Sequence, residues 1–323
     1  MTGTMQALVI DRAGDADELH LAEVPRPTRV SDEVVVRVVA AGVNPIDVKT
    51  RAGRGVSAAI PSYPAVLGND FAGIVEAVPY AAHPLQPGDR VYGMGRVPRL
   101  GGSYAEFLSV SSMSVARMPA SLGFVEAAGV PLAALTAWGA VIDTARAHEG
   151  QRMLVHAASG GVGHFAVQLA TYFGAVVTAT CSTRNLDFVR SLGARQVVDH
   201  TAERFEDVVA DQDVVIDLVG SVDDTGTRSL GVLRPHGLVV NVPTGSWPTM
   251  AAEAEARGIR ATGYSVSPDA RTLSVITRLI DDGSVRVHVE RELPLASGAE
   301  AHRLIEDGHV RGKVVLRVAV DPE

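Results

Sequence analysis

Hydrophobic and polar positions alternate with a period of two along the first third of the chain. Over 33–40 the valines at 34, 36 and 38 share one face and Arg37 lies on the other, which predicts a strand. Glycines interrupt or precede two further strand-like runs, 66–78 and 104–110, and Pro-Gly-Asp-Arg at 87–90 is typical of a turn. Short strands at this spacing predict a small, barrel-like unit made mainly of β-strands.

Beyond Pro119 the pattern changes, because apolar strands now alternate with segments of helical period. Residues 121–145 are expected to be helical. Strands are expected at 153–157, 175–180, 196–199, 213–219 and 238–242, with helices at 162–173, 185–192 and 225–233 between them. This alternation predicts a doubly wound parallel sheet. Two more helices, 273–281 and 298–307, and a last strand, 313–318, follow it.

The predicted fold class is therefore α/β, with two domains. A chain of 323 residues is long enough for two domains of about 150 residues each. The order of a β-rich unit, a doubly wound unit and a remaining tail indicates that the tail returns to the first unit. We place the mainly β domain at 1–118 and 267–323, and the doubly wound domain at 119–266.

Composition and charge narrow the class of protein. The 29 Lys and Arg residues against 37 Asp and Glu give a net charge of −8, and an acidic chain without a basic run is a poor nucleic-acid binder. The single cysteine, Cys181, cannot form an intramolecular disulfide or a cysteine-rich zinc lobe, which favours the cytoplasm. The N-terminal sequence does not resemble a signal peptide, and the apolar stretch 127–142 is too short to span a bilayer, so no membrane partner is expected.

A glycine-rich turn between an expected strand and an expected helix is the most specific local motif. Residues 153–163 are MLVHAASGGVG, and Ala158, Gly160 and Gly163 occupy the three small-residue positions of the dinucleotide fingerprint. Gly160 and Gly161 let the backbone approach a pyrophosphate, which would lie on the N–H groups at the start of the helix. The alternative is a tight turn without a ligand, although the flanking strand and helix are those that the motif requires.

The residues after the second strand of this unit indicate which cofactor binds. Enzymes that use NAD place Asp or Glu there to hold the ribose 2′-hydroxyl, but no carboxylate lies between Glu149 and Asp187. Ser182 and Arg184 stand there instead and can hold a 2′-phosphate, so we predict NADPH as the cofactor. In the alternative, Ser182 caps the next helix and Arg184 is solvated, which leaves the missing acid unexplained.

Seven short motifs occur along the chain in an order that is typical of a known family. They are NPIDVK at 44–49, LGNDFAG at 67–73, PGDRVYG at 87–93, GSYAE at 102–106, AALTAW at 133–138, ASGGVG at 158–163 and GHVRGK at 308–313. Together they resemble the medium-chain dehydrogenase/reductase superfamily, and most of all its zinc-free quinone oxidoreductase and enone reductase branch. The resemblance implies a GroES-like β-barrel catalytic domain, an inserted Rossmann domain and a homodimer.

Zinc ligands are missing where that superfamily would place them. Its zinc-containing members have Cys at the position of Asn44 and Gly-His-Glu at the positions of Gly68, Asn69 and Asp70. His148-Glu149 lacks the second histidine of a metal-binding helix, and the other histidines are scattered. We therefore expect no metal, and alcohol oxidation would lack the Lewis acid that stabilises an alkoxide.

Reduction of an activated double bond needs only positioning and hydrogen-bond donors to the carbonyl oxygen, on which negative charge develops. The resemblance places Asn44 near the nicotinamide. Lys49 stands at the last position of the same motif, where other quinone oxidoreductases carry Tyr, and its ammonium is a candidate donor to that oxygen, with Asp47 orienting Lys49 or the substrate. Tyr63 is a second candidate proton donor. Alternatively, Asp47 and Lys49 form a surface ion pair of under about 1 kcal/mol, and Tyr63 only packs.

The remaining candidates concern the cofactor. Thr136 resembles a position near the nicotinamide, or is a buried threonine bonded to its own helix. His200 stands where relatives have an adenine-contacting tyrosine, so its role stays open, and Cys181 is taken as inert. The candidate cofactor-binding residues are Asn44, Thr136, Ser159, Gly160, Gly161, Val162, Ser182, Arg184, His200 and Val219.

These observations predict a zinc-independent, NADPH-dependent oxidoreductase that transfers hydride to quinones or α,β-unsaturated carbonyls. An enoyl-thioester or biosynthetic tailoring reductase on the same scaffold is the alternative among enzymes. A low-turnover NADPH-binding redox sensor is the alternative outside enzymes, because a fold does not by itself establish catalysis.

Overall fold

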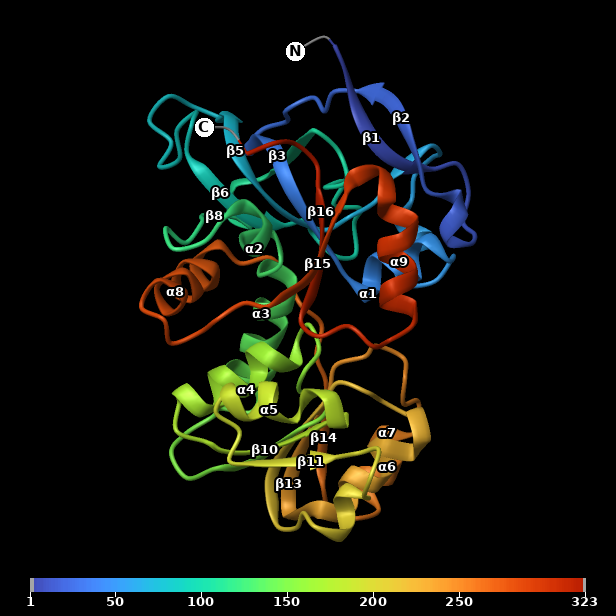
Figure 1. The fold of residues 1–323 in the computed structure, drawn as a ribbon, viewed down its shortest axis with the longest axis vertical. Helices are drawn as coiled ribbons and strands as arrows, with labels where there is room; N and C mark the ends of the chain where they lie inside the picture. Colours follow the sequence, from blue (N-terminus) through green and yellow to red (C-terminus); the bar gives the residue numbers. More distant parts are fainter. Residues whose placement is uncertain (1–2, 322–323) are drawn as a thin grey trace. The chain divides into compact units, whose positions relative to one another are not determined.

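The computed structural model describes residues 3–321 and divides the chain into two compact units (Figure 1). Unit 1 contains Met1–Leu135 and Ser267–Glu323, and unit 2 contains Thr136–Val266. This first boundary differs from the one expected at 118/119. The reason is that helix α2 (Phe124–Ala128) packs on strands β3 (Glu33–Val43) and β5 (Asp70–Ala77) and so belongs to unit 1.

Unit 1 is built on two sheets. In the described residues, the larger sheet has seven strands in the order β15-β16-β3-β5-β6-β8, with β7 paired to β3, and the smaller has the order β2-β1-β4. The strands not yet given are β1 (Thr4–Ile10), β2 (His20–Pro25), β4 (Ala65–Val66), β6 (Arg90–Met94), β7 (Phe107–Ser111), β8 (Val115–Arg117), β15 (Val289–Pro294) and β16 (Lys313–Arg317).

One face of β3 follows the predicted period of two, but most of the opposite face is buried as well, since Val35 and Val39 are 1% and 0% exposed. Val34, Val36 and Val38 are fully buried and pack in one cluster with Phe71 and Val91 from the neighbouring strands. The longer β3 also pairs with β16 through Val43 and Val314, which joins the C-terminal segment to the N-terminal one. The core of unit 1 therefore draws on both ends of the chain.

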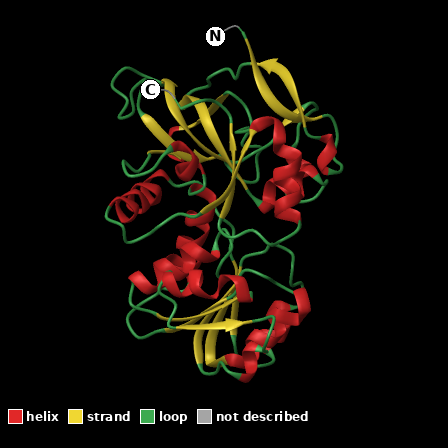
Figure 2. Ribbon diagram, in the orientation of Figure 1, coloured by secondary structure: helices red, strands yellow, loops and turns green. Residues whose placement is uncertain are grey.

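Helices flank the sheets of unit 1. They are α1 (Pro45–Arg51), α8 (Ala270–Asp281) and α9 (Gly298–Glu306), and α1 lies beside α9 (Figures 1 and 2). The buried guanidinium of Arg51 forms an ion pair with Glu306 and donates from Nε to the carbonyl oxygen of Gly14 at 3.1 Å. This contact ties the start of the chain to its C-terminal segment.

Unit 2 is the predicted doubly wound sheet. Its six strands in the described residues are all parallel, in the order β11-β10-β9-β12-β13-β14. Helices lie on both sides of this sheet (Figure 2). The strands are β9 (Arg152–Val155), β10 (Val176–Cys181), β11 (Gln196–Asp199), β12 (Gln212–Asp217), β13 (Leu233–Asn241) and β14 (Arg260–Gly263), and the helices are α4 (Gly163–Tyr172), α5 (Leu186–Ser191), α6 (Thr225–Ser229) and α7 (Met250–Glu255). The α/β class is confirmed.

Some elements differ from the expected ones. The helix expected over 121–145 is broken into α2, α3 (Pro131–Trp138) and a π-helical turn, Gly139–Thr144. Pro131 has no N–H to continue α2, which separates α2 from α3. Strands β2, β14 and β15 were not expected, since their residues are mostly exposed or half-buried and show no long apolar face.

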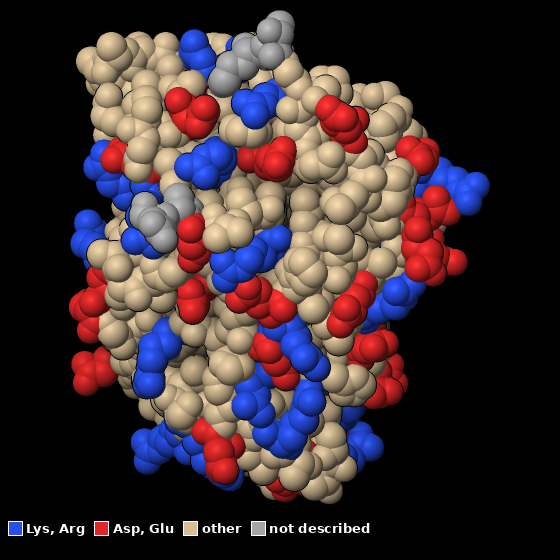
Figure 3. Space-filling model, turned by 45° about the horizontal axis from the view of Figure 1, so that its top comes forward, with Lys and Arg blue, Asp and Glu red and all other residues tan. Residues whose placement is uncertain are grey.

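Charged side chains of both signs are interspersed on the face drawn in Figure 3. None of the helices in residues 3–321 is both long enough and apolar enough to cross a bilayer.

Candidate functional site

The glycine turn of unit 2 joins the end of β9 to the start of α4. A Cβ atom on Gly163 would lie 2.2 Å from the carbonyl oxygen of Ala157, so only glycine allows the helix to begin this close to the strand end. At Gly160 a Cβ atom would meet only that same oxygen, at 3.3 Å. Space beside Gly160 is therefore left for a ligand, while Gly163 is required by the fold itself.

The candidate cofactor residues of unit 2, apart from Thr136, lie at one edge of its sheet. They follow the carboxyl ends of four neighbouring strands: Ser159, Gly160, Gly161 and Val162 follow β9, Ser182 and Arg184 follow β10, His200 follows β11 and Val219 follows β12. Ligands of open α/β sheets bind at this edge. Thr136 lies buried in α3, and Asn44 belongs to unit 1.

Asn185 links the first two of these loops. Its amide group donates to the hydroxyl of Ser159 at 3.0 Å and to that of Ser182 at 3.2 Å. In the sequence alone, Asn185 is only the first residue of an expected helix. The contact holds the glycine turn and the end of β10 in a fixed relation, so that both can face one ligand.

A carboxylate reaches this edge from the neighbouring strand. Asp199 ends β11 and pairs in register with Cys181 at the end of β10. Its oxygens accept from the hydroxyls of Thr183 (2.5 Å) and Thr201 (2.6 Å), and these hydrogen bonds lower the pKa of Asp199. The sequence has no carboxylate between Glu149 and Asp187. The register of the sheet nevertheless places that of Asp199 beside the end of β10, where two threonine hydroxyls donate to it.

His156 lies beneath the glycine turn. Its ring nitrogens lie 3.0 Å from the hydroxyl of Thr180 on β10 and 2.9 Å from that of Ser229 on α6. Burial lowers the pKa of His156 to about 4, although Asp217 opposes the shift. The neutral imidazole therefore joins β9, β10 and α6 directly before the turn.

Cys181 is buried at the end of β10, and burial raises the pKa of its thiol to about 11. The thiolate is the nucleophilic form, and a raised pKa keeps the group in its neutral thiol form at neutral pH. This geometry favours the inert interpretation.

Unit 1 contains a buried polar cluster of Asn44, Asp47, Asn69, Asp70 and Lys313. Asp47 is held at both oxygens, because Oδ2 accepts from the backbone N–H of Asn44 at 2.9 Å and Oδ1 from the amide of Asn69 at 2.7 Å. Burial raises the pKa of Asp47 to about 7. The carboxyl group thus fixes the start of α1 and is not half of a surface ion pair with Lys49.

Asp70 and Lys313 complete this buried polar cluster. The amide of Asn44 donates to Oδ2 of Asp70 at 2.9 Å, and the backbone N–H of Leu132 donates to Oδ1 at 2.8 Å. The ammonium of Lys313 donates to Oδ1 of Asn44 and lies 3.5 Å from Oδ2 of Asp70. In the sequence alone, Asn69 and Asp70 stand out only as departures from zinc ligands, and Lys313 only as the end of a motif.

Two further side chains extend the network toward α9. The hydroxyl of Tyr104 lies 3.3 Å from Oδ2 of Asp47 and 3.3 Å from Nε2 of His302. Burial raises the pKa of Tyr104 and lowers that of His302 to about 3. All three groups are therefore shielded from water.

The other candidates of unit 1 lie outside this network. Lys49 is half-buried in the last turn of α1. Tyr63 is 43% exposed and precedes a cis proline, Pro64. Both side chains are accessible enough to meet a small molecule.

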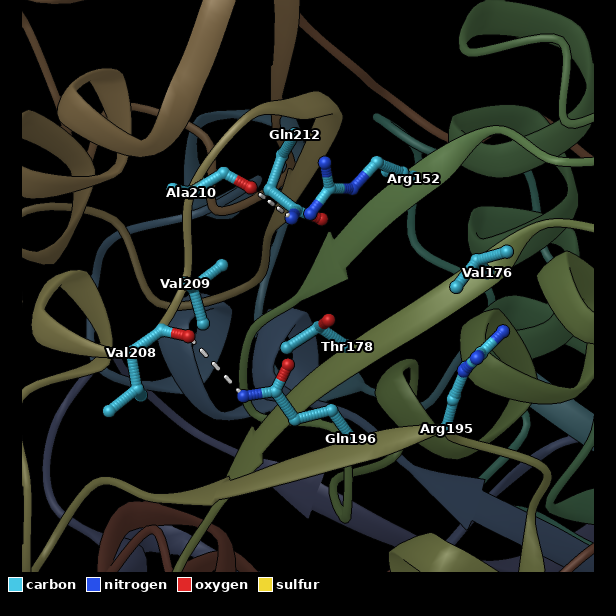
Figure 4. Close-up of a pocket in the computed structure, with 9 residues that line it drawn as sticks. All are labelled: Arg152, Val176, Thr178, Arg195, Gln196, Val208, Val209, Ala210 and Gln212. Carbon is cyan, nitrogen blue, oxygen red and sulfur yellow. Dashed lines mark hydrogen bonds between the residues drawn. The ribbon is translucent and has the colours of Figure 1, made fainter.

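A cavity of about 510 Å³ lies at the opposite edge of the sheet of unit 2 (Figure 4). Its lining includes the first residues of four neighbouring strands: Arg152, Val176, Gln196 and Gln212. The connection from β11 to β12 passes over it with only a 3-10 turn, Phe205–Asp207, where a doubly wound sheet usually has a helix. Because the strands are parallel, this cavity is separate from the glycine turn.

The chain is similar to known proteins over nearly its whole length. The chain matches the descriptions "Alcohol dehydrogenase GroES-like domain" over residues 30–120 and "Zinc-binding dehydrogenase" over residues 192–316. It is 34% identical over 322 residues to NADPH-dependent alkenal/one oxidoreductase, chloroplastic, of Arabidopsis thaliana, which covers 97% of this chain and 79% of that one. It is 32% identical over 360 residues to NAD(P)H oxidoreductase RTN4IP1, mitochondrial, of Danio rerio, with 98% and 92% covered.

A solved structure is also similar over nearly the whole chain. The quinone oxidoreductase from Coxiella burnetii superimposes with a TM-score of 0.92 at 35% identity, and the match covers 98% of this chain and 100% of that one.

Zinc, which one matched description implies, does not fit the donors of the buried polar cluster. Zinc sites use cysteine, histidine and carboxylate ligands, and of these the cluster offers only Asp47 and Asp70, whose oxygens all accept hydrogen bonds already. Asn44 and Asn69 offer amide oxygens, and that of Asn44 accepts from Lys313. The amide oxygen of Asn69 has no hydrogen-bond partner among the described residues, but one neutral oxygen is not enough to bind a zinc ion. Within residues 3–321, no group of three or more His, Cys, Asp or Glu side chains could hold a metal ion.

The buried imidazole of His156 predicts a loss of stability in acid. In the unfolded chain this group takes up a proton near pH 6.5, but in the folded chain only near pH 4, so its contribution is lost as pH falls from 6.5 toward 4. This amounts to about 2 kcal/mol between pH 7.5 and pH 5. We therefore expect His156→Gln to destabilise the protein less at pH 5 than at pH 7.5, as measured by urea unfolding.

The exposed His148 provides the control. His148→Gln should change the free energy of unfolding by a similar small amount at both pH values. An equal loss at the two pH values in His156→Gln would contradict the assignment of a neutral, buried imidazole.

Proposed function

Because this chain belongs to the medium-chain dehydrogenase/reductase superfamily and is an oxidoreductase of its quinone and enone reductase type, we propose that it reduces quinones or α,β-unsaturated carbonyls with NADPH and without zinc. The observation that carries the proposal is the turn at the carboxyl edge of unit 2, where Gly163 has no room for a side chain and Gly160 leaves space for a ligand. The names of the alkenal/one oxidoreductase and of the quinone oxidoreductase support the acceptor class.

The residues at this edge fit a dinucleotide. We propose that the pyrophosphate lies on the turn formed by Ser159, Gly160, Gly161 and Val162, since ten-residue α4 presents its first backbone N–H groups there. Ser182 and Arg184 would hold the 2′-phosphate, which favours NADPH over NADH. His200 and Val219 follow the adjacent strands and would contact the adenosine end or the nicotinamide end.

The candidate residues that do not lie at the carboxyl edge of the sheet would act at the nicotinamide end of the cofactor. Thr136 and Asn44 are proposed to lie near the nicotinamide, as the superfamily's motifs imply. Asn44 is almost fully buried and its orientation is fixed by its hydrogen bonds, so it can act as a rigid positioning group. Asp47 holds Asn44 through the backbone N–H and is proposed to position it without touching substrate.

The bound cofactor supplies the hydride. The chain's task is then to hold the acceptor and stabilise the negative charge that develops on its carbonyl oxygen. We propose that the ammonium of Lys49 donates to that oxygen. Tyr63 is the second candidate proton donor, and its exposed hydroxyl allows exchange with water. Neither role needs a metal.

We also propose that the protein is a cytoplasmic homodimer. Its single cysteine is buried and needs no oxidising compartment. Strand β14 ends the sheet of unit 2 with one edge that pairs with no other strand of the described chain, and such edges can pair with a second copy. Light scattering that shows a monomer at micromolar concentration would contradict the dimer.

Arg184→Ala tests the cofactor choice. Removing a guanidinium from a phosphate typically costs about 1.5–3 kcal/mol, so KM for NADPH should rise roughly 10- to 100-fold while KM for NADH changes less than about twofold. The exposed Arg190, on α5, supplies the control variant Arg190→Ala, which should affect neither cofactor strongly. Equal losses with the two cofactors would remove the phosphate role.

Lys49→Met tests the donor to the carbonyl oxygen. Loss of one such donor costs on the order of 100-fold in kcat, so saturating NADPH and an enone should show a large fall in kcat. The dissociation constant for NADPH, measured by fluorescence, should stay within about twofold. Tyr63→Phe is the companion variant, and an unchanged kcat in Lys49→Met with a large loss in Tyr63→Phe would transfer the role to Tyr63.

A further inference from the structure

Lys313 is an unusual residue in this chain. Of the 29 basic residues only two are lysines, Lys49 and Lys313, and all the others are arginines. The side chain of Lys313 is 3% exposed, although lysine is among the residues least often buried. In a chain that uses arginine almost everywhere, a buried lysine indicates that the compact ammonium group is itself needed at this place.

The register of the sheet places this ammonium beside Asn44. Val314 of β16 pairs with Val43 of β3, so Lys313 faces Asn44 one residue further along. Its Nζ atom donates to the side-chain oxygen of Asn44, lies 3.3 Å from the carbonyl oxygen of Val43 and lies 3.5 Å from Oδ2 of Asp70. The three N–H donors of the ammonium thus face three acceptors.

The same contacts fix which way the amide of Asn44 points. Its oxygen faces the ammonium of Lys313 and its nitrogen faces the carboxylate of Asp70, at 2.9 Å. Turning the amide over would place N–H groups against the cation and an oxygen against the carboxylate, and both contacts would be repulsive. Asp70 cannot move aside, because the backbone N–H of Leu132 holds its other oxygen at 2.8 Å.

Burial disfavours charge on the ionisable groups of the cluster, because it raises the pKa of Asp47 and Asp70 and lowers that of Lys313. The 3.5 Å contact between Nζ of Lys313 and Oδ2 of Asp70 opposes these shifts in the buried polar cluster. Two carboxyl groups, Asp47 and Asp70, are fully buried within it, and both act electrostatically on Lys313. Buried charges persist only when they are paired and hydrogen-bonded. Lys313 meets both conditions.

We propose that the ammonium of Lys313 is the resident cation of the buried polar cluster, at the place where zinc-containing members of the superfamily hold their metal, and that it is the positioning residue that fixes the amide of Asn44. The second part rests on the proposed function, because that function gives Asn44 a place beside the nicotinamide. The first part concerns charge and stability and is independent of turnover.

The small number of lysines allows a direct test of the charge. A sample labelled with nitrogen-15 only in lysine contains two side-chain nitrogens, and the spectrum of Lys49→Met identifies the signal of Lys313. At pH 7.5 the Nζ shift of Lys313 should be that of an ammonium, with N–H protons that exchange slowly because the group is buried. A shift typical of a neutral amine would overturn the proposal.

Stability variants test the pairing. Lys313→Met and Asp70→Asn should each lower the melting temperature by about 10 °C, because each leaves one buried charge without its partner. The double variant removes both charges of this pair. Asp47 stays buried, but burial raises its pKa to about 7, so it can take up a proton and the variant should return to within about 3 °C of the wild type. Additive losses in the double variant would show that the two groups do not pair.

Kinetics of the double variant separate positioning from a purely structural role. The amide introduced at position 70 offers both a donor and an acceptor, so nothing charged fixes the amide of Asn44. We expect kcat to fall at least about tenfold while the dissociation constant of NADPH stays within about twofold. A wild-type kcat in this stable variant would make Lys313 a counter-ion only and overturn the positioning role.

The two proposals can fail separately. If the wild type turns over none of a panel of quinones and enones, the proposed function and the positioning role fail, whereas the nitrogen signal and the stability variants still decide whether Lys313 is the cation. If purified protein contains one zinc per chain by elemental analysis, the resident cation is the metal and the proposal is wrong.

Discussion

The close approach of Gly163 to the carbonyl oxygen of Ala157 is the constraint on which the nucleotide site depends. A Cβ atom at position 163 would lie only 2.2 Å from that oxygen, which is too close for any side chain. The backbone can therefore pass from β9 to α4 in a single tight turn only with glycine at this position. Because β9 lies between β10 and β12, the turn stands in the middle of the row of strand ends. His156 and Asn185 then fix the turn against its neighbours through neutral hydrogen bonds.

Unit 1 depends on a different feature, the buried polar cluster that contains charged side chains. Amide side chains at 44 and 69 occupy the positions where metal ligands would stand in zinc-containing relatives, and an ammonium supplies positive charge to Asp70. Apart from the side-chain oxygen of Asn69, the polar groups of the cluster contact neighbours of complementary charge or hydrogen-bonding type. A cluster arranged in this way is rigid, because moving one member leaves another buried and unpaired.

Local pattern determined much of what the sequence could predict. The valines of β3, the alternation of strands and helices in unit 2 and the glycine turn all follow from residues close together in the chain, and the structure shows each of them. Strand β15 could not be predicted, because its sequence, VERELP, is mostly exposed and has no apolar face. The strongly apolar composition of 121–145 predicts one continuous helix, although Pro131 breaks it.

Contacts between distant segments determined what the sequence could not predict. Lys313 and Asn44 are 269 residues apart, and only the antiparallel register of β16 and β3 brings them together. Asp199 reaches the end of β10 through the parallel register of β11, although it lies well beyond the segment in which an acid was sought. The burial of Asp47 likewise depends on Asn69 and Tyr104, which no spacing rule relates to it.

Binding of NADPH to Gly160→Ala tests the central claim most directly. The new methyl group would meet only the carbonyl oxygen of Ala157, at 3.3 Å, so the variant should fold with a melting temperature within a few degrees of the wild type, about 1 kcal/mol or less. Titration should show that the wild type binds NADPH and that the variant binds it at least about tenfold more weakly, because the methyl group occupies the place of the pyrophosphate. Gly231→Ala, where a Cβ atom meets nothing within 4 Å, should bind as the wild type does. Equal affinity in wild type and Gly160→Ala, or no binding to the wild type, would contradict the account.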